Sequence, residues 1–254
     1  MTSQLQVTVV GCSGSVPGPD GPASCYLVEA EGFRALLDLG NGALGALQRH
    51  CSFGDVDAVL LSHLHPDHCM DVLSLYVART YDTSGGYPSI PIYGPEGTGA
   101  HLASAYGRAE HPGLSGCFDF RNWSAGAHHI GPLMVTVAKV AHPVPTWAMR
   151  VEHGGRALVY SADTGPSAAL VDLARDAQLA LFESSFEEGR DDTAPGALHL
   201  TGRQAGEHAR EAGVDRLVVT HLPPWNDKAV SLAAATAAFG GPVELAASGT
   251  TYDV

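Results

Sequence analysis

The feature that most constrains this chain is a cluster of metal-binding residue types directly after a short apolar run. Residues 57–62, DAVLLS, have the composition of a buried strand and lead into HLHPDH. Alternate residues of an extended segment point the same way, so His63 and His65 can approach one ion. Where the chain turns into a helix, Asp67 and His68 can approach a second ion. Buried polar groups need partners, so this cluster would be costly without a bound cation.

Three later residues extend this cluster, and each of them follows its own strand-like run. His142 ends VAKVAH, Asp163 lies in LVYSAD, and His221 ends LVVTH. Alone, each could be a polar residue that closes a loop. Together they indicate one rim, because sites in open sheets form outside the carboxyl ends of the strands.

We assign these residues to two divalent metal ions per chain, with zinc expected and manganese as the alternative. The first ion takes His63, His65 and His142. The second ion takes Asp67, His68 and His221. Asp163 bridges both ions, together with a water or hydroxide. Two ions about 3.5–4 Å apart suit in-line displacement at phosphorus, and Asp67 would also orient the nucleophile or accept its proton.

Composition narrows the partners that the chain can have. Its 254 residues include 27 acids against 14 bases, which gives a formal charge of −13. Nucleic-acid-binding proteins usually carry a basic stripe, so the charge argues against RNA and DNA. A small phosphate ester stays compatible, because bound metal ions reverse the potential locally. With no apolar run of 18 residues and no basic leader, we expect no membrane segment and a cytoplasmic protein.

Strand and helix patterns alternate along the chain in two successive halves. They predict one domain over residues 1–254 with an α/β fold, an αβ/βα sandwich of two mixed β-sheets face to face with helices outside. A single doubly wound sheet is the alternative. The predicted strands cover 5–11, 24–30, 33–40, 57–62, 90–95, three runs within 133–165, 179–185, 215–224 and 243–248. The predicted helices cover 40–51, 67–80, 96–109, 167–177, 201–213 and 227–241, with Thr201 as an N-cap and Gly213 past the end of its helix.

The seven ligands reproduce the set of the metallo-β-lactamase superfamily, which the chain resembles. The order of LDLGNG, SADTG, FESSF, HLTGRQAGEHAREAG and LVVTHLPP is similar to the tRNase Z-like branch. In that branch a glutamate and a histidine form a pair beside the metals. The resemblance implies that His199 is the general acid for the leaving alkoxide and that Glu183 orients it. A positioned acid contributes about 10²–10⁴-fold to such a step.

Two departures from tRNA-processing enzymes bear on the substrate. Those enzymes carry a long arm between the ligands that match His142 and Asp163, whereas only a strand pair fits here, and we find no basic loop. The whole chain instead resembles the armless atypical class II-type cyclic nucleotide phosphodiesterases, which are related to anti-Pycsar proteins. VVGCSGSVPGPDGPASCYLV, GALGALQRH and THLPPW carry this similarity. It implies hydrolysis of 3′,5′-cyclic nucleotides, cyclic AMP first, to 5′-monophosphates, and a homodimer in which the neighbour partly closes the site.

Further substrate contacts are expected from a turn and a loop. Ser13 and Ser15, in the Gly-rich turn, could offer donors to the phosphate or sugar, or could belong to a plain tight turn. The loop 81–88, YDTSGGYP, is a candidate lid or partner contact. Tyr87 in it would either stack on a base or pack against the protein.

Other functions share part of this pattern. A tRNase Z-like ribonuclease, or a phosphodiesterase for another small diester, would use the same ligands. Thioester hydrolysis would also share them but does not require the pair Glu183 and His199. A metal-sensing module without activity should lack a ligand or the acid, and the sequence has all of them.

Overall fold

The computed structural model describes residues 4–83, 86–191 and 198–254, and its strands form two sheets of seven. The strands of the first sheet are β1 (Gln6–Gly11), β2 (Cys25–Ala30), β3 (Phe33–Leu37), β4 (Ala58–Leu60), β5 (Ile90–Gly94), β6 (Phe118–Asn122) and β14 (Thr251–Asp253). The strands of the second are β7 (Gly126–Ile130), β8 (Leu133–Lys139), β9 (Trp147–His153), β10 (Arg156–Tyr160), β11 (Leu179–Glu183), β12 (Leu217–Thr220) and β13 (Val243–Leu245). The orders are β14-β1-β2-β3-β4-β5-β6 and β13-β12-β11-β10-β9-β8-β7.

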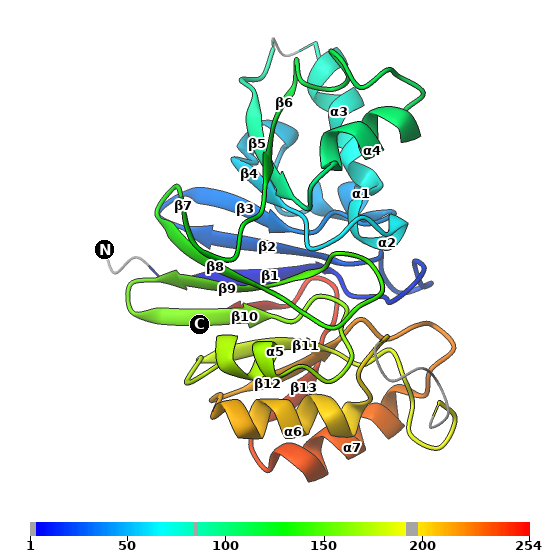
Figure 1. Cartoon of the computed structure of the whole chain (residues 1–254), viewed down its shortest axis with the longest axis vertical. Helices are drawn as coiled ribbons and strands as arrows, with labels where there is room; N and C mark the ends of the chain where they lie inside the picture. Colours follow the sequence, from blue (N-terminus) through cyan, green and yellow to red (C-terminus); the bar gives the residue numbers. More distant parts are fainter. Residues whose placement is uncertain (1–3, 84–85, 192–197) are drawn as a thin grey trace.

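Helices cover the outer faces of the two sheets (Figure 1). They are α1 (Ala43–Leu47), α2 (Pro66–Cys69), α3 (Asp71–Tyr81), α4 (Thr98–Ala105), α5 (Ala168–Leu173), α6 (Gly202–Ala212) and α7 (Lys228–Phe239), with a 3-10 turn η1 (Phe53–Asp55). Helices α1, α3 and α4 lie outside the first sheet, and α5, α6 and α7 lie outside the second (Figure 1). The predicted αβ/βα sandwich is therefore confirmed, and the doubly wound alternative is wrong. In the described part of the chain, no helix has the length and apolar character needed to cross a bilayer.

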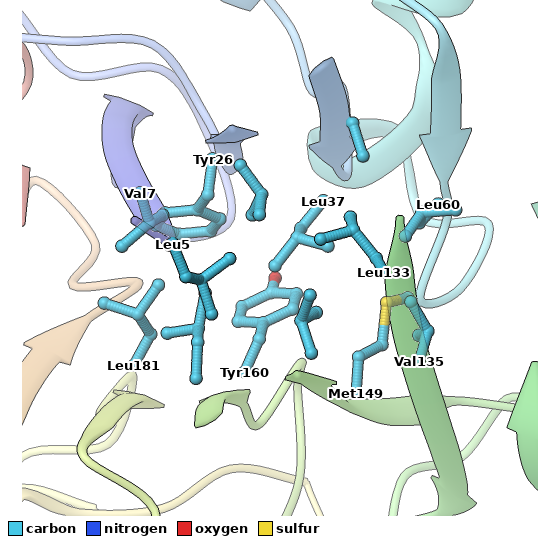
Figure 2. Close-up of a cluster of buried hydrophobic side chains, with 14 of the residues drawn as sticks. Leu5, Val7, Tyr26, Leu37, Leu60, Leu133, Val135, Met149, Tyr160 and Leu181 are labelled. Atoms are coloured by element: carbon cyan, nitrogen blue, oxygen red, sulfur yellow. The ribbon is translucent and has the colours of Figure 1, made fainter. Parts of the chain in front are cut away.

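Central strands are apolar on both faces because each sheet lies between its partner and a helical layer. In β2, Tyr26 and Val28 belong to the core between the sheets, while Cys25 and Leu27 pack towards the helices. This is the period of two expected of a strand, with both faces buried. Figure 2 shows the core between the sheets, where Tyr160 of β10 lies among leucines from both sides.

The sequence analysis missed three strands, all at or next to sheet edges. Strands β6 and β7 end the two sheets at one side, and β14 ends the first sheet at the other. The sequences FDFRN and GAHHI are half exposed and polar, as is typical of edge strands, so they lack a clear apolar period. The capping of α6 was predicted correctly: the Thr201 side chain accepts from the N–H of Gln204, and Gly213 has φ 69°.

The topology places strand ends from both sheets at one edge of the sandwich. Strands β10, β11 and β12 run parallel, and so do β3 and β4. Each of the predicted ligands Asp163 and His221 follows the carboxyl end of one of these strands, β10 and β12 respectively. The fold thus brings residues more than 150 positions apart to one place.

Candidate metal centre

The structure brings the seven predicted ligands together in two groups that share Asp163. One group contains His63, His65, His142 and Asp163, and the other contains Asp67, His68, Asp163 and His221. Within each group the ligand atoms lie within 4.8 Å of one another. The grouping is the one that we assigned from the sequence, including the shared aspartate.

The first group is built around the ring of His65. Its Nδ1 lies 3.0 Å from Nε2 of His63 and 3.4 Å from Nε2 of His142. Asp163 approaches from β10, with Oδ2 3.7 Å from Nε2 of His63. Three ring nitrogens and a carboxylate oxygen therefore face a common point, which is the ligand number of a tetrahedral zinc site.

The second group is more deeply buried. The Nε2 atoms of His68 and His221 lie 3.1 Å apart, and Oδ1 of Asp163 lies 3.2 and 3.4 Å from them. Oδ2 of Asp67 lies 3.2 Å from Nε2 of His221 and 3.5 Å from that of His68. The two carboxylates thus flank the pair of imidazoles.

Hydrogen bonds on the far side of the rings decide which nitrogen faces each group. The Ser185 hydroxyl donates to the carbonyl of His221, so it accepts from Nδ1 of that ring at 2.7 Å. Nδ1 of His142 donates to the carbonyl of Leu198 at 2.9 Å. These bonds fix the proton on Nδ1 and leave the lone pair of Nε2 directed into the site, as is usual for metal-binding histidines.

Asp38 orients the rings of His68 and, through Ser62, His63, and the sequence analysis did not identify this role of Asp38. Its Oδ2 accepts from Nδ1 of His68 at 2.7 Å, from the Ser62 hydroxyl at 2.7 Å and from the Tyr160 hydroxyl at 2.8 Å. Because the Ser62 proton goes to Asp38, the Ser62 oxygen accepts from Nδ1 of His63 at 3.0 Å. The available signal was the motif LDLG, an acid directly after a strand.

The charge of the site indicates cations. Asp38, Asp67, Asp163 and Glu183 are all buried carboxylates, and Oδ1 of Asp163 has no hydrogen-bond partner. Burial raises the pKa of Asp163, but the charges of His221 and His68 outweigh burial and hold that pKa well below its usual value. Burial lowers the pKa of His63 and of His142. Burial lowers the pKa of His68, but Asp163 and Asp38 outweigh burial and raise that pKa well above its usual value. A divalent cation can take the place of the proton that these carboxylates favour, and imidazole and carboxylate are the donors that such cations prefer, so these residues fit the two ions.

The backbone around the centre is strained. Six non-glycine residues in the described chain have φ in the left-handed region, and three of them are Asp38, Ala162 and His221. Such conformations cost about 1–3 kcal/mol each and persist where the surroundings enforce them. Here they occur at Asp38, at Ala162 directly before the predicted ligand Asp163, and at the predicted ligand His221.

The predicted pair Glu183 and His199 lies beside both groups. Nδ1 of His199 donates to Oε1 of Glu183 at 2.9 Å, and the ring centroid lies 5.5 Å from that of His142. Burial lowers the pKa of His199, but the charge of Glu183 and the hydrogen bond to it raise the pKa to about 9. Glu183 also accepts from the backbone N–H of Thr164 at 2.7 Å and of Ser185 at 3.0 Å. The bond from Thr164 connects the acid to the segment that carries Asp163.

The substrate contacts predicted for Ser13, Ser15 and Tyr87 find less support in the structure. Ser13 donates its hydroxyl proton to the carbonyl of Val16 within its own turn, so only its oxygen can face a ligand. Ser15 is exposed with φ 63°. Tyr87 is half-buried, donates to Asp82 and lies 5.0 Å from the guanidinium of Arg79, which favours packing over base stacking. Positions 84–85 of the predicted lid 81–88 lie outside the described residues.

Comparison with known proteins places this centre in a family. Residues 34–222 match the family described as "Beta-lactamase superfamily domain". The chain is 44% identical over 256 residues to the uncharacterized protein ML1173 of Mycobacterium leprae, with 98% of this chain and 89% of that protein covered. It is 31% identical to the probable metallo-hydrolase YhfI of Bacillus subtilis, with 98% and 100% covered. The crystal structure of YhfI superposes with a TM-score of 0.87 at 28% identity, covering 99% and 100%. The Ribonuclease Z of Myxococcus xanthus is 29% identical, with 99% and 98% covered.

Proposed function

The chain belongs to the metallo-β-lactamase superfamily, and from that premise we propose that it is a metal-dependent phosphodiesterase of 3′,5′-cyclic nucleotides. The metallo-hydrolase fold and the two His/Asp groups support a hydrolytic enzyme. The observation that carries the finer proposal is the pair Glu183 and His199 beside them. Cyclic AMP is the first candidate substrate, and a 5′-monophosphate is the product.

His199 is suited to protonate an alkoxide. Burial lowers the pKa of His199, but Glu183 outweighs burial and favours the ring with both protons. Nδ1 is held by Glu183, so the Nε2 proton is the one available to a leaving group. Opening a cyclic phosphodiester expels an alkoxide, which is a strong base, and a positioned acid accelerates that step by about 10²–10⁴-fold. A thioester hydrolase expels a thiolate, a weaker base that does not require this acid.

The ligands would hold two divalent ions, zinc first and manganese as the alternative. When bound, such ions supply a nucleophile from water near neutral pH and neutralise charge on the phosphoryl oxygens. The residues of the chain do the rest. Asp67, with Oδ2 in contact with His221 and His68, would orient the nucleophile or accept its proton. The orienting bonds from Asp38 and Ser185 keep the rings from turning away.

A small substrate agrees better with this chain than RNA does. Between His142 and Asp163 the chain forms only the hairpin of β9 and β10, with no room for an additional arm. The formal charge is −13, so a polyanion is repelled at long range. The likeness to Ribonuclease Z of Myxococcus xanthus keeps a tRNase Z-like ribonuclease as the second candidate, together with phosphodiesterases of other small diesters. A homodimer and a cytoplasmic location stay predictions.

A turnover panel tests the proposal. The purified full chain with zinc or manganese is incubated with 3′,5′- and 2′,3′-cyclic nucleotides, bis-p-nitrophenyl phosphate and a precursor tRNA. We expect the 3′,5′-cyclic nucleotides to be hydrolysed fastest and His199→Ala to lose about 10²–10⁴-fold in kcat while it binds the same amount of metal. Preferred cleavage of the precursor tRNA would support the ribonuclease instead, and no turnover of any diester would refute both.

A further inference from the structure

A pocket of about 280 Å³ adjoins the segment that carries the predicted ligand His221. Three segments line it: the Gly-rich turn 12–21, the stretch 222–228, and the loop 246–248. We refer to it as the rim pocket. Small-molecule sites in proteins usually begin at about 300 Å³, so the rim pocket suits one ring system and not a peptide or an oligonucleotide.

The rim pocket and the metal centre share a wall. Leu222, which lines the pocket, directly follows the ligand His221. The Gly-rich turn packs on the same segment, because the N–H of Gly14 donates to the carbonyl of Leu222 at 3.2 Å. A Cβ at Gly14 would lie only 2.3 Å from the carbonyl oxygen of His221, so no side chain separates the turn from the ligand. The rim pocket therefore adjoins the backbone of a predicted metal ligand.

Two exposed apolar side chains lie in segments that line this pocket. They are Val16 and Trp225, two of the five large apolar residues with substantial exposure in the described chain. Val16 belongs to the Gly-rich turn, and Trp225 lies in sequence between the lining residues Pro224 and Lys228. Trp225 is 60% exposed and only four residues after His221, so their Cα atoms are at most about 15 Å apart.

Trp225 is exposed in a turn that is held rigidly. The N–H of Asn226 donates to the carbonyl of Pro223, and its side chain donates to the carbonyl of Ser185 at 3.0 Å. Arg190 donates to the Asn226 side chain at 2.9 Å, and the N–H of Asp227 donates to Glu187 at 2.7 Å. Because the backbone on either side of Trp225 is held, only the two side-chain torsions of Trp225 lose freedom when a flat ring stacks on the indole, which favours binding.

The polar groups of the pocket can read the edge of a heterocycle. Lys228 offers donors and Asp20 offers acceptors, and the Ser248 hydroxyl offers both. Lys228 is one of only two lysines in a chain of charge −13, and it lies in the first turn of α7. Its charge also attracts an anionic substrate towards this side of the centre.

We propose that the rim pocket and Trp225 together bind the nucleobase of the substrate while its phosphate lies at the metal centre. This inference rests on the proposed function, since it names the part of a cyclic nucleotide that the metal centre does not hold. Stacking on the indole would supply affinity for any base, and Lys228, Asp20 and Ser248 would discriminate between bases.

Fluorescence tests the binding part without any turnover. Trp123 and Trp147 are buried and Trp225 is exposed, so a contact ligand changes chiefly the emission of Trp225. The probe is adenosine, which has no phosphate for the metal centre, added to the full chain with its metals. We expect saturable quenching that is absent in Trp225→Phe and weakened about tenfold in Ala247→Leu, which fills the pocket from its exposed wall. Ala237→Leu makes the same change on an exposed part of α7 and serves as the control.

Kinetics separates this inference from the proposed function. The kcat/KM for cyclic AMP, divided by that for methyl p-nitrophenyl phosphate, should fall about tenfold or more in Trp225→Ala and in Ala247→Leu, mainly through KM. It should be retained in Ala237→Leu, and it should fall less in Trp225→Phe, which keeps an aromatic ring, than in Trp225→Ala. If wild type hydrolyses cyclic AMP but adenosine causes no quenching and the ratios do not change, the pocket is not the base site and the function stands. If adenosine binds as expected but no diester is hydrolysed, the proposed function fails instead. A concentration-dependent loss of Trp225 exposure without any adenosine effect would show that a second copy covers this surface, and would overturn the inference.

Discussion

Replacing Asp38 with asparagine tests the geometry of the metal centre, because this buried residue touches no proposed ion. Its two oxygens accept four hydrogen bonds: Oδ1 from the N–H of Ser62 at 2.6 Å, and Oδ2 from the Ser62 hydroxyl, His68 and Tyr160. An asparagine keeps the shape but replaces one acceptor by a donor. In the better of the two orientations the amide faces the N–H of Ser62, and one buried donor loses its partner.

The magnitude follows from that count. A buried donor without a partner costs about 1–3 kcal/mol, so Asp38→Asn should lower the free energy of unfolding by that amount. Loss of the negative charge also weakens the hold on Nδ1 of His68 and makes its Nε2 a poorer ligand. Orienting partners of metal ligands contribute about 10–100-fold to metal affinity, so we expect a decrease in that range.

The assay is competition with a chelator, monitored by zinc release, alongside urea unfolding. Tyr160→Phe removes one donor but leaves the charge and the other three bonds, so metal affinity should fall less than in Asp38→Asn. Asp172→Asn, at a largely exposed carboxylate paired with Arg175, should change neither quantity. If folded Asp38→Asn releases zinc at the same chelator concentration as wild type, Asp38 does not orient the ligands and our reading of the hydrogen bonds is wrong.

Three further predictions concern the same centre. Asp163→Ala should retain at most one tightly bound ion per chain by elemental analysis, because both groups share this carboxylate; two retained ions would exclude a bridging role. The pKa of His199 is raised to about 9 from an ordinary value of about 6.5, so its pairing with Glu183 stabilises the fold fully below about pH 6.5 and the stabilisation is lost as the pH rises through 9. Urea unfolding of chelator-treated protein should show this loss, Glu183→Gln should abolish it, and an unchanged pH dependence in that variant would contradict the pairing. Light scattering should show a homodimer, and a monomer with full turnover would remove the shared-site hypothesis.

The sequence was sufficient where a residue type and its place at a strand end agreed. HLHPDH after DAVLLS, and single residues after the runs that became β8, β10 and β12, predicted both groups of histidines and aspartates without any knowledge of distances. The edge strands β6, β7 and β14 were missed because hydrogen bonds to a neighbouring strand hold them in place. Such strands do not need an apolar face, so their sequences show no apolar period.

Orienting residues could not be predicted in the same way, because their role depends on partners far away in the chain. Asp38 and Tyr160 are 122 positions apart, and nothing in either local motif shows that their side chains meet. The same holds for Ser185, whose hydroxyl fixes His221 from 36 positions away. A local pattern can indicate that an acid follows a strand, but the sheet order decides whether that acid reaches the ion or the ring behind it.

The metal centre and the rim pocket differ in burial, and this difference affects how substrate specificity can evolve. Most of the predicted ligands, and Asp38 and Glu183, are buried, so we expect a substitution there to disturb the whole centre. Several residues that line the rim pocket, among them Ser248 and Lys228, are exposed. Substitutions in these walls can change which organic group is accepted while the reaction at the metal centre is preserved. Relatives that share the ligand set can therefore differ in substrate, and the walls of this pocket are where we expect that difference to be encoded.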